Sequence, residues 1–481
     1  MLFRSFAERR DEITRQLVAV ASKIGGGVRA IEDSALLDEV TALVERPNVL
    51  ACAFEKDFLD VPPECLILTM KANQKYFPLL DAQGKLSNQF LVVSNITPDD
   101  ASAVIGGNER VVRPRLADAK FFFDQDRKKS LSVRAEGLAN VVYHNKLGTQ
   151  AERTQRVRAI AKALAGLMHK GYDAAFLHAV DTAAQLAKAD LLTDMVGEFP
   201  ELQGIMGGYY ARHDGLHADI AEAIEDHYKP RFAGDDLPRN PVGLVVAMAD
   251  KLETLVGMFG IGNLPTGDKD PFALRRHALG VIRMLRESSL TISLSDIIGQ
   301  TVAVFGSGIT DPHVPLTAFF YDRLSASLRE QGFSAQEVEA VLALRPQQLS
   351  DITRRLQAVR AFVALPESQA LAAANKRIGN ILKKADEVQG DVNTNLLTEA
   401  AEKALFQTMQ QLTPEARKLW AAGDYTASLQ TLSALRKPVD AFFDDVMVNA
   451  EDLALRQNRQ RLLKQLHVAM NQVADLACLA V

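Results

Sequence analysis

The chain has 481 residues, which is long for a single compact domain, so about three domains are expected. Its hydrophobic content of 47% and charged content of 24% are ordinary for a globular protein and exclude a disordered or fibrous chain. The formal net charge of −5 excludes a global positive field, so any contact with RNA would have to use local basic patches.

Cysteine usage and hydropathy predict the compartment. The three cysteines, Cys52, Cys65 and Cys478, form neither a CxxC motif nor a disulfide framework, which is typical of a reducing cytosol. No apolar run approaches the ~20 residues that a membrane-spanning helix needs. The first residues show no secretory signal. We therefore expect a cytoplasmic protein that does not bind a membrane.

The first part of the chain, 1–145, mixes helices and strands. An amphipathic helix is expected at 6–25, and a second helix at 34–44 with Asp33 or Ser34 as its N-cap. Three strands are expected, and turn residues 81–85 join the last two into a hairpin: 50–54, 76–80 and 90–96.

The segment 110–129 carries seven basic and three acidic residues, interleaved with three consecutive phenylalanines. Arg113 and Arg115 are among the basic residues. One interpretation is a core helix with a solvated basic face. The other is a surface that binds nucleic acid or a partner subunit.

Helices dominate the part 146–290. Val157, Ile160 and Leu164 recur at helical spacing. The segment 199–211 is expected to be a glycine-rich break between helices, and its glycines match no phosphate-loop spacing. Farther on, Pro271 is expected at a helix start, so that Arg275 and Arg276 emerge within two turns.

The order of parts in 146–290 resembles the HD-domain phosphohydrolases, in which two His and two Asp residues hold a divalent metal. On that pattern the two carboxylates are Asp190 and Asp250, the first His falls on or near Arg153, and the second becomes Ala189. Two carboxylates without imidazoles make a poor transition-metal site, and an arginine repels the ion. The resemblance therefore implies a retained scaffold without a metal, which favours a binding module over a hydrolase.

Another pair of possible metal ligands is His213 and His217, which are four residues apart. Asp214 and Gly215 lie between them and make a shared helix doubtful, and no third ligand is evident. The sequence contains no GxSxG, no GxxxxGK[ST], and no GxGxxG in a strand-to-helix context. We therefore predict no catalytic residue and no metal site in this chain.

The part 291–370 is a run of helices without a chemical motif, and 371–481 is helical again. In the last helix Arg459 falls within the apolar stripe, so its guanidinium needs a partner. Asp440 and Asp444 are the candidates on the facing helix. Arg456, Arg461 and Lys464 are expected to point outward and are the better RNA contacts.

Seven blocks, spread over most of the chain, resemble the beta subunit of the bacterial heterotetrameric glycyl-tRNA synthetase. One is AlaAsnLysArgIleGlyAsnIle at 374–381, which contains Lys376 and Arg377. The segment 438–448 also resembles the helical anticodon-binding domain of arginyl-tRNA synthetase and its class I relatives. The blocks are 70–78, 107–122, 198–207, 230–238, 265–276, 374–381 and 438–448. That family's beta subunit usually begins with a further region, so the chain is expected to be N-terminally truncated.

The resemblance implies a division of labour. In that family the alpha subunit activates glycine with ATP and Mg²⁺, and the beta subunit binds tRNA(Gly) within an alpha2beta2 enzyme. The implied architecture is mainly α and multidomain: a mixed α/β part at 1–145, an HD-like helical domain at 146–290, a helical linker at 291–370 and an anticodon-binding bundle at 371–481. The expected tRNA contacts are Arg113, Arg115, Arg275, Arg276, Lys376, Arg377, Arg456, Arg461 and Lys464. The alternative is a free-standing helical RNA-binding or scaffold protein derived from such a subunit.

Overall fold

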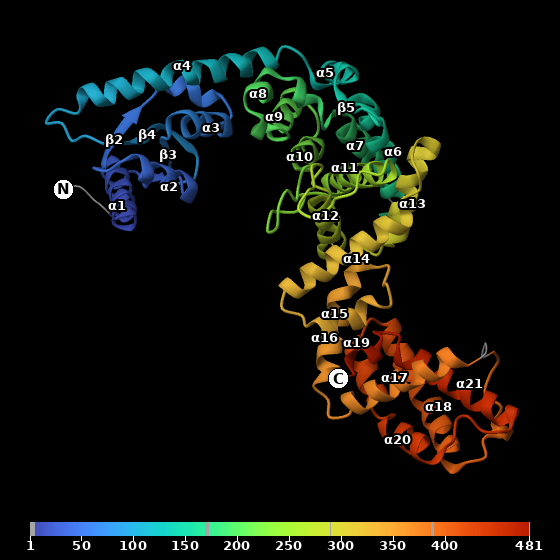
Figure 1. The fold of residues 1–481 in the computed structure, drawn as a ribbon. Coiled ribbons are helices and arrows are strands. Elements are labelled where there is room, and N and C mark those ends of the chain that lie inside the picture. Colours follow the sequence, from blue (N-terminus) through green and yellow to red (C-terminus); the bar gives the residue numbers. More distant parts are fainter. Residues whose placement is uncertain (1–4, 169–172, 289, 386–388, 481) are drawn as a thin grey trace. The chain divides into compact units, whose positions relative to one another are not determined.

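The computed structural model describes residues 5–168, 173–288, 290–385 and 389–480. Over these ranges the chain is mainly helical, with a four-stranded and a two-stranded antiparallel sheet (Figure 1). The predicted fold class, mainly α and multidomain, is confirmed. In the described part, no helix is both long enough and apolar enough to cross a membrane.

The chain divides into two compact units. The first unit comprises residues 5–158, 173–228 and 238–247, and the second comprises 159–168, 229–237 and the described residues from 248 to 480. The four-part division at 145, 290 and 370 stays a prediction.

The first unit contains these helices and strands: α1 (Phe6–Ile24), β1 (Arg29–Ala30), α2 (Ser34–Leu43), β2 (Asn48–Ala53), α3 (Pro63–Gln74), β3 (Phe77–Leu80), β4 (Leu86–Ser94), α4 (Ser102–Asp126), α5 (Leu131–Glu136), β5 (Val142–His144), β6 (Gly148–Thr149), α7 (Ala174–Leu186), the 3₁₀ helix η3 (Ala189–Leu192), α8 (Asp194–Glu198), α9 (Ile205–His213) and α10 (Ala218–Asp226). Two helices have residues in both units: α6 (Gln150–Met168) and α11 (Pro241–Gly260). The second unit contains α12 (Leu274–Glu287), α13 (Leu294–Phe305), α14 (His313–Glu330), α15 (Ala335–Leu342), α16 (Ile352–Val363), α17 (Ser368–Lys384), α18 (Ala400–Ala421), α19 (Tyr425–Ser433), α20 (Arg436–Asp445) and α21 (Leu453–Met470).

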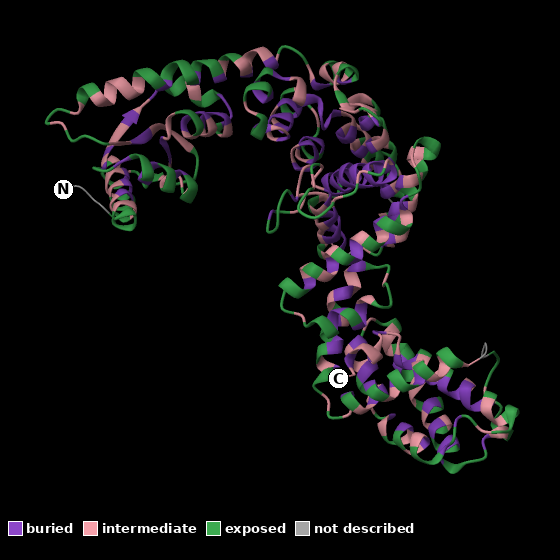
Figure 2. Ribbon diagram, in the orientation of Figure 1, coloured by how far each residue is buried: buried purple, intermediate pink, exposed green. Residues whose placement is uncertain are grey.

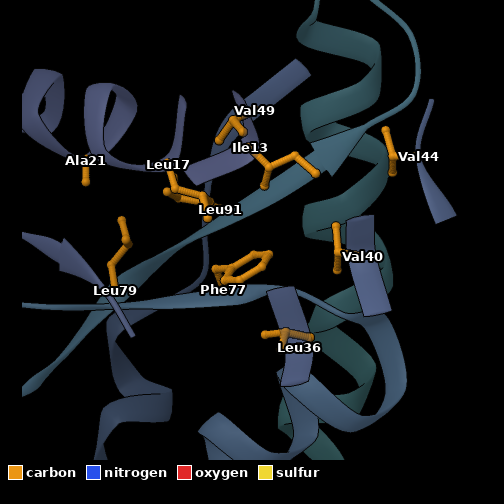
Figure 3. Close-up of a cluster of buried hydrophobic side chains, with 10 residues drawn as sticks. All are labelled: Ile13, Leu17, Ala21, Leu36, Val40, Val44, Val49, Phe77, Leu79 and Leu91. Atoms are coloured by element: carbon orange, nitrogen blue, oxygen red, sulfur yellow. The ribbon is translucent and has the colours of Figure 1, made fainter. Parts of the chain in front are cut away.

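The four-stranded sheet has the order β1-β3-β4-β2, and α1 and α2 pack on it. Figure 3 shows the buried cluster between them. Ile13, Leu17 and Ala21 enter it from α1 because residues four apart share a helix face. Phe77 from β3 is 1% exposed there, and burial of such a side chain stabilises the fold by about 1.5–3 kcal/mol. The predicted helices and hairpin are confirmed to within a few residues, and Asp33 is the N-cap of α2.

The basic segment 110–129 forms most of α4. Val112, Leu116 and Phe123 are buried along one side, and Arg115 and Phe121 are exposed on another. The prediction of a helix with a buried face and a solvated basic face is therefore confirmed. Whether that basic face also binds nucleic acid or a partner subunit stays a prediction.

The prediction of a glycine-rich break at 199–211 is wrong for its second half, because α9 begins at Ile205. Gly207 and Gly208 allow close packing instead of interrupting the helix. A Cβ on Gly207 would lie 2.7 Å from Ile224 Cγ2, and one on Gly208 would lie 3.1 Å from Glu225 Cβ. The glycines are therefore the positions where α9 packs against α10, a contact that composition alone does not reveal.

Helix α12 begins at Leu274 and not at Pro271, so that predicted start is also wrong. The physical reason is a carboxylate cap. Asp270 accepts hydrogen bonds from the backbone N–H groups of Leu274 (2.8 Å) and Arg275 (2.9 Å), which satisfies two amides at the start of the helix.

Helix α11 is buried almost all round, as Figure 2 shows by its purple colour. Every residue from Val245 to Val256 is at most 5% exposed. A helix that is apolar on all sides belongs to a core. The helix nevertheless contains the buried charged residues Asp250, Lys251 and Glu253. The Lys251 ammonium donates a hydrogen bond to the Lys229 carbonyl at 2.8 Å.

Candidate nucleic-acid interface

The C-terminal bundle consists of α17 to α21 in the second unit, which pack on one another. Leu462, Leu463 and Leu466 of α21 are fully buried, as their helical spacing predicts. The apolar stripe leaves the remaining sides of α21 to polar and basic side chains. These sides line two grooves.

Arg459 is 5% exposed on the buried side of α21 and has a structural role, as predicted. Its predicted partners were wrong. The guanidinium forms an ion pair with the fully buried Glu402 of α18 and donates to the Met447 carbonyl at 2.8 Å. Asp440 instead lies within reach of Arg436, 3.6 Å away. Sequence spacing identified a buried arginine but could not show which helix faces it.

The α18–α21 groove has a volume of about 810 Å³. Arg417 and Lys418 line it from α18, and Arg461 and Lys464 line it from α21. The lining also includes uncharged polar side chains, several apolar ones and, among the described residues, one carboxylate: Gln410, Thr413, Gln465, Phe406, Met409, Pro414, Val468 and Asp391. Four cations and a partly exposed aromatic ring have the chemistry of a site that binds phosphates and stacks a base.

The predicted contacts of α21 differ from one another in their surroundings. Lys464 is exposed, whereas Arg461 is half-buried and donates from Nε to the Gln389 carbonyl at 2.7 Å. Arg456 is also half-buried, near the start of the helix, and its Nε has no hydrogen-bond partner in the described part of the chain. Another nitrogen of the Arg456 guanidinium donates to the Glu451 carbonyl at 3.5 Å in an exposed hydrogen bond, so this side chain is partly accessible and its role as an RNA contact stays a prediction.

The other two predicted residues of the bundle lie on α17. Lys376 and Arg377 are exposed and line a second hollow, the α17–α21 groove, of about 460 Å³. The guanidinium carbon of Arg377 lies 4.2 Å from the centroid of the Phe443 ring, a cation–π contact.

The remaining predicted contacts lie elsewhere in the chain. In the first unit, Arg113 pairs with Glu55 at 2.6 Å, and Arg115 is exposed. In the second unit, Arg276 is exposed on α12 and Arg275 donates to the Gly267 carbonyl at 2.5 Å. The structure thus gathers five of the predicted contacts in one bundle, and their role in RNA binding stays a prediction: Lys376, Arg377, Arg456, Arg461 and Lys464.

The four positions that resemble an HD site are all buried. Arg153 is buried, with its guanidinium 4.8 Å from the centroid of the Tyr143 ring, and Ala189 is fully buried at the start of η3. Asp190 accepts from the backbone N–H groups of Gly204 (2.6 Å) and Gly207 (3.0 Å), so its carboxylate positions the start of α9. Burial raises the pKa of Asp190 to about 6. Asp250 is buried on α11.

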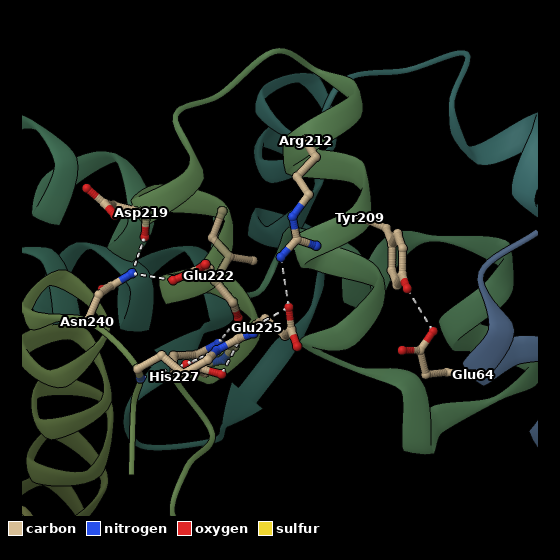
Figure 4. A network of polar contacts seen from close by, with 11 residues as sticks. Glu64, Tyr209, Arg212, Asp219, Glu222, Glu225, His227 and Asn240 are labelled. Atoms are coloured by element: carbon tan, nitrogen blue, oxygen red, sulfur yellow. Dashed lines mark hydrogen bonds and ion pairs between the residues drawn. The ribbon is translucent and has the colours of Figure 1, made fainter. Parts of the chain in front are cut away.

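Carboxylates near α9 and α10 bond to neighbouring polar side chains (Figure 4). Tyr209 donates to Glu64 at 2.9 Å, and Arg212 pairs with Glu225 at 3.1 Å. His213 ends α9 and His217 caps α10, so they do not share a helix, as the intervening turn predicted. Across the described residues, no three His, Cys, Asp or Glu side chains gather closely enough to hold a metal ion.

Sequence reasoning missed several residues that line the grooves. Arg417 and Lys418 were not singled out, nor were the amides Asn380, Asn449 and Gln460 of the α17–α21 groove. Helical spacing offered one signal, since Arg461, Lys464 and Gln465 lie three or four residues apart. Nothing in the sequence indicated which other helix completes each groove.

Two family models match the chain in succession. Residues 2–343 match the glycyl-tRNA synthetase beta subunit, and residues 371–477 match the DALR anticodon binding domain. Among curated proteins, the glycine–tRNA ligase beta subunits of Paracidovorax citrulli and Delftia acidovorans are each 70% identical over 477 residues. These alignments cover 99% of this chain and 67% of each relative, so the chain spans about two thirds of their length. The beta subunit of Polaromonas naphthalenivorans is 71% identical over 474 residues. This chain therefore belongs to the glycyl-tRNA synthetase beta subunit family.

Proposed function

We propose that this chain is the tRNA-binding beta component of a glycine–tRNA ligase. The observation that carries the proposal is the DALR anticodon binding match at 371–477, which coincides with the bundle whose grooves are lined by cations. A negatively charged polynucleotide is the partner that such cations fit. The free-standing scaffold alternative lacks a comparable observation.

The partner subunit follows from the family. We infer that an alpha subunit supplies the site where glycine and ATP react, and that the assembly is alpha2beta2 in the cytoplasm. We infer that ATP and Mg²⁺ are used by the alpha subunit, and among the described residues of this chain no three His, Cys, Asp or Glu side chains gather to hold a metal ion. The residues proposed here bind and orient tRNA, and no step of aminoacyl transfer is assigned to them.

Co-expression with an alpha subunit of the same family tests the proposal. The two chains are expected to elute together from a size-exclusion column and to charge tRNA(Gly) with labelled glycine. This chain alone is expected to form neither glycyl-adenylate nor glycyl-tRNA, but to retain tRNA in a filter-binding assay. Charging by the isolated chain, or absence of tRNA binding at low salt, would refute the division of labour.

A further inference from the structure

The α17–α21 groove has a lining unlike that of the larger groove beside it. Three cations line it, Lys376, Arg377 and Lys384, together with three amides, Asn380, Asn449 and Gln460. Among the described residues that line it, none is a carboxylate. Its volume of about 460 Å³ lies within the range of small-ligand sites.

Within the described ranges, no carboxylate pairs with the cations of this groove. Lys376 and Lys384 are exposed, and neither forms an ion pair or hydrogen bond with any residue that the structure describes. The contact of Arg377 with the Phe443 ring engages the face of the guanidinium and not its N–H groups. Arg459, on the same helix as Gln460, is by contrast fully paired with Glu402. An uncompensated basic cluster attracts an anion.

Gln460 provides an independent observation. Its side chain lines the groove, yet the residue is only 8% exposed. Its amide makes no hydrogen bond with the described residues, whereas the neighbouring Asn458 both donates to the Asn393 carbonyl (3.0 Å) and accepts from the Asn393 N–H (2.8 Å). The Gln460 amide faces the open groove and has no hydrogen-bond partner among the described residues, so its donors and its acceptor are available to a ligand there.

The amides decide between ligand classes. The carboxylates of an acidic peptide only accept hydrogen bonds, so they would leave the carbonyl oxygens of Gln460, Asn380 and Asn449 without a donor. An unstacked RNA base presents donors and acceptors together on one edge, which an amide matches, and it is attached to a phosphodiester that lysines bind. RNA-binding proteins read sequence mainly in such single-stranded, splayed nucleotides.

We propose that the α17–α21 groove is a base-reading subsite for one unpaired nucleotide of the tRNA. Lys376 and Lys384 hold its phosphodiester, and the Gln460 amide bonds to an edge of its base. This inference rests on the proposed tRNA-binding function and deepens it. It assigns base discrimination to this groove and leaves general phosphate attraction to the α18–α21 groove.

The test uses the full chain with tRNA(Gly) and with a tRNA(Gly) of altered anticodon. Gln460→Met keeps the length of the side chain and removes the amide, so affinity for tRNA(Gly) should fall about tenfold, and the preference between the two RNAs should shrink. Gln460→Glu should weaken binding further, because its charge repels the phosphate. Lys376→Ala should lower the affinity for both RNAs by the same factor. It should also make the slope of log affinity against log salt concentration shallower by about 0.7–0.9.

Lys403→Ala is the matched control, since Lys403 is an exposed lysine of the same bundle that lines neither groove. It should leave affinity and preference unchanged, and the melting temperature of every variant is measured so that loss of the fold is distinguished from loss of binding. If the unaltered chain binds no tRNA, the proposed function itself fails. If the unaltered chain binds tRNA, two results would overturn only the groove assignment. One is that both Gln460 variants keep the wild-type preference between the two tRNAs. The other is that Lys403→Ala lowers the affinity as much as Lys376→Ala does.

Discussion

Two buried carboxylates show how single residues in this chain are satisfied in different ways. Glu402 accepts from the backbone N–H groups of Thr398 (2.7 Å) and Glu399 (2.9 Å), and its charge is balanced by Arg459. Asp190 has only backbone donors, and its second oxygen has no hydrogen-bond partner in the described ranges. The ion pair of Glu402 connects two helices. Burial raises the pKa of Asp190 to about 6.

We expect Arg459→Ala to lower the free energy of unfolding by ~3 kcal/mol, because it leaves the charge of Glu402 buried without a counterion. Thermal melting of the two proteins measures the effect. Arg461→Ala, which removes a half-buried guanidinium that donates to the Gln389 carbonyl, should leave the melting temperature nearly unchanged. Equal melting of the Arg459 variant and the wild type would contradict a structural role for this pair.

Asp190 predicts a pH dependence of stability. Its folded pKa of about 6 lies above the ordinary value, so the folded state favours the protonated acid. Its contribution is fully present below the unfolded pKa of about 3.9 and is lost as pH rises through about 6. Asp190→Asn cannot titrate. Its stability relative to the wild type should therefore rise by roughly 2–3 kcal/mol between about pH 4 and pH 7. Urea unfolding at several pH values checks this, and a constant difference would exclude the raised pKa.

At the scale of elements, the start of α12 and the close packing of α9 against α10 depend on individual residues that hydrophobic periodicity does not take into account. Asp270 sets the start of α12 three residues beyond the expected proline. Two glycines that read as a break lie inside α9, because the neighbouring helix leaves no room for a methyl group. Helices with a strong apolar stripe, such as α1 and α21, were predicted correctly.

Gly207→Ala should destabilise the protein by about 1–3 kcal/mol, because the new Cβ would lie 2.7 Å from Ile224 Cγ2. The control is Gly106→Ala in α4, where an added Cβ meets nothing within 4 Å. That substitution should stabilise by about 0.5–1 kcal/mol, since alanine restricts the unfolded chain and favours a helix. Both effects can be measured by thermal unfolding. A stabilised Gly207 variant would show that α9 does not pack against α10 as described.

At the scale of the whole molecule, RNA binding must overcome a net charge of −5. We therefore expect tRNA affinity to depend on local clusters and to fall at least about tenfold between about 50 and 200 mM salt, because each phosphate contact releases counterions. Fluorescence anisotropy with labelled tRNA measures the slope. Arg276→Ala, at an exposed position on α12, should make the slope of log affinity against log salt concentration shallower by about one. A salt-independent affinity would mean that phosphate contacts do not drive binding.

The sequence by itself determined the helical character of the chain, its N-terminal hairpin and its family, because these depend on local periodicity and on ordered blocks of residues. It also indicated that Arg459 needs a buried partner, since position on a helical wheel is a local property. Tertiary structure alone decided that the partner is Glu402, fifty-seven residues away, and that Gln460 is buried at the edge of a basic groove. Such partners and grooves form where two helices pack against each other. Which helices pack together depends on apolar faces that lie far apart in the sequence, so a local sequence pattern does not predict it.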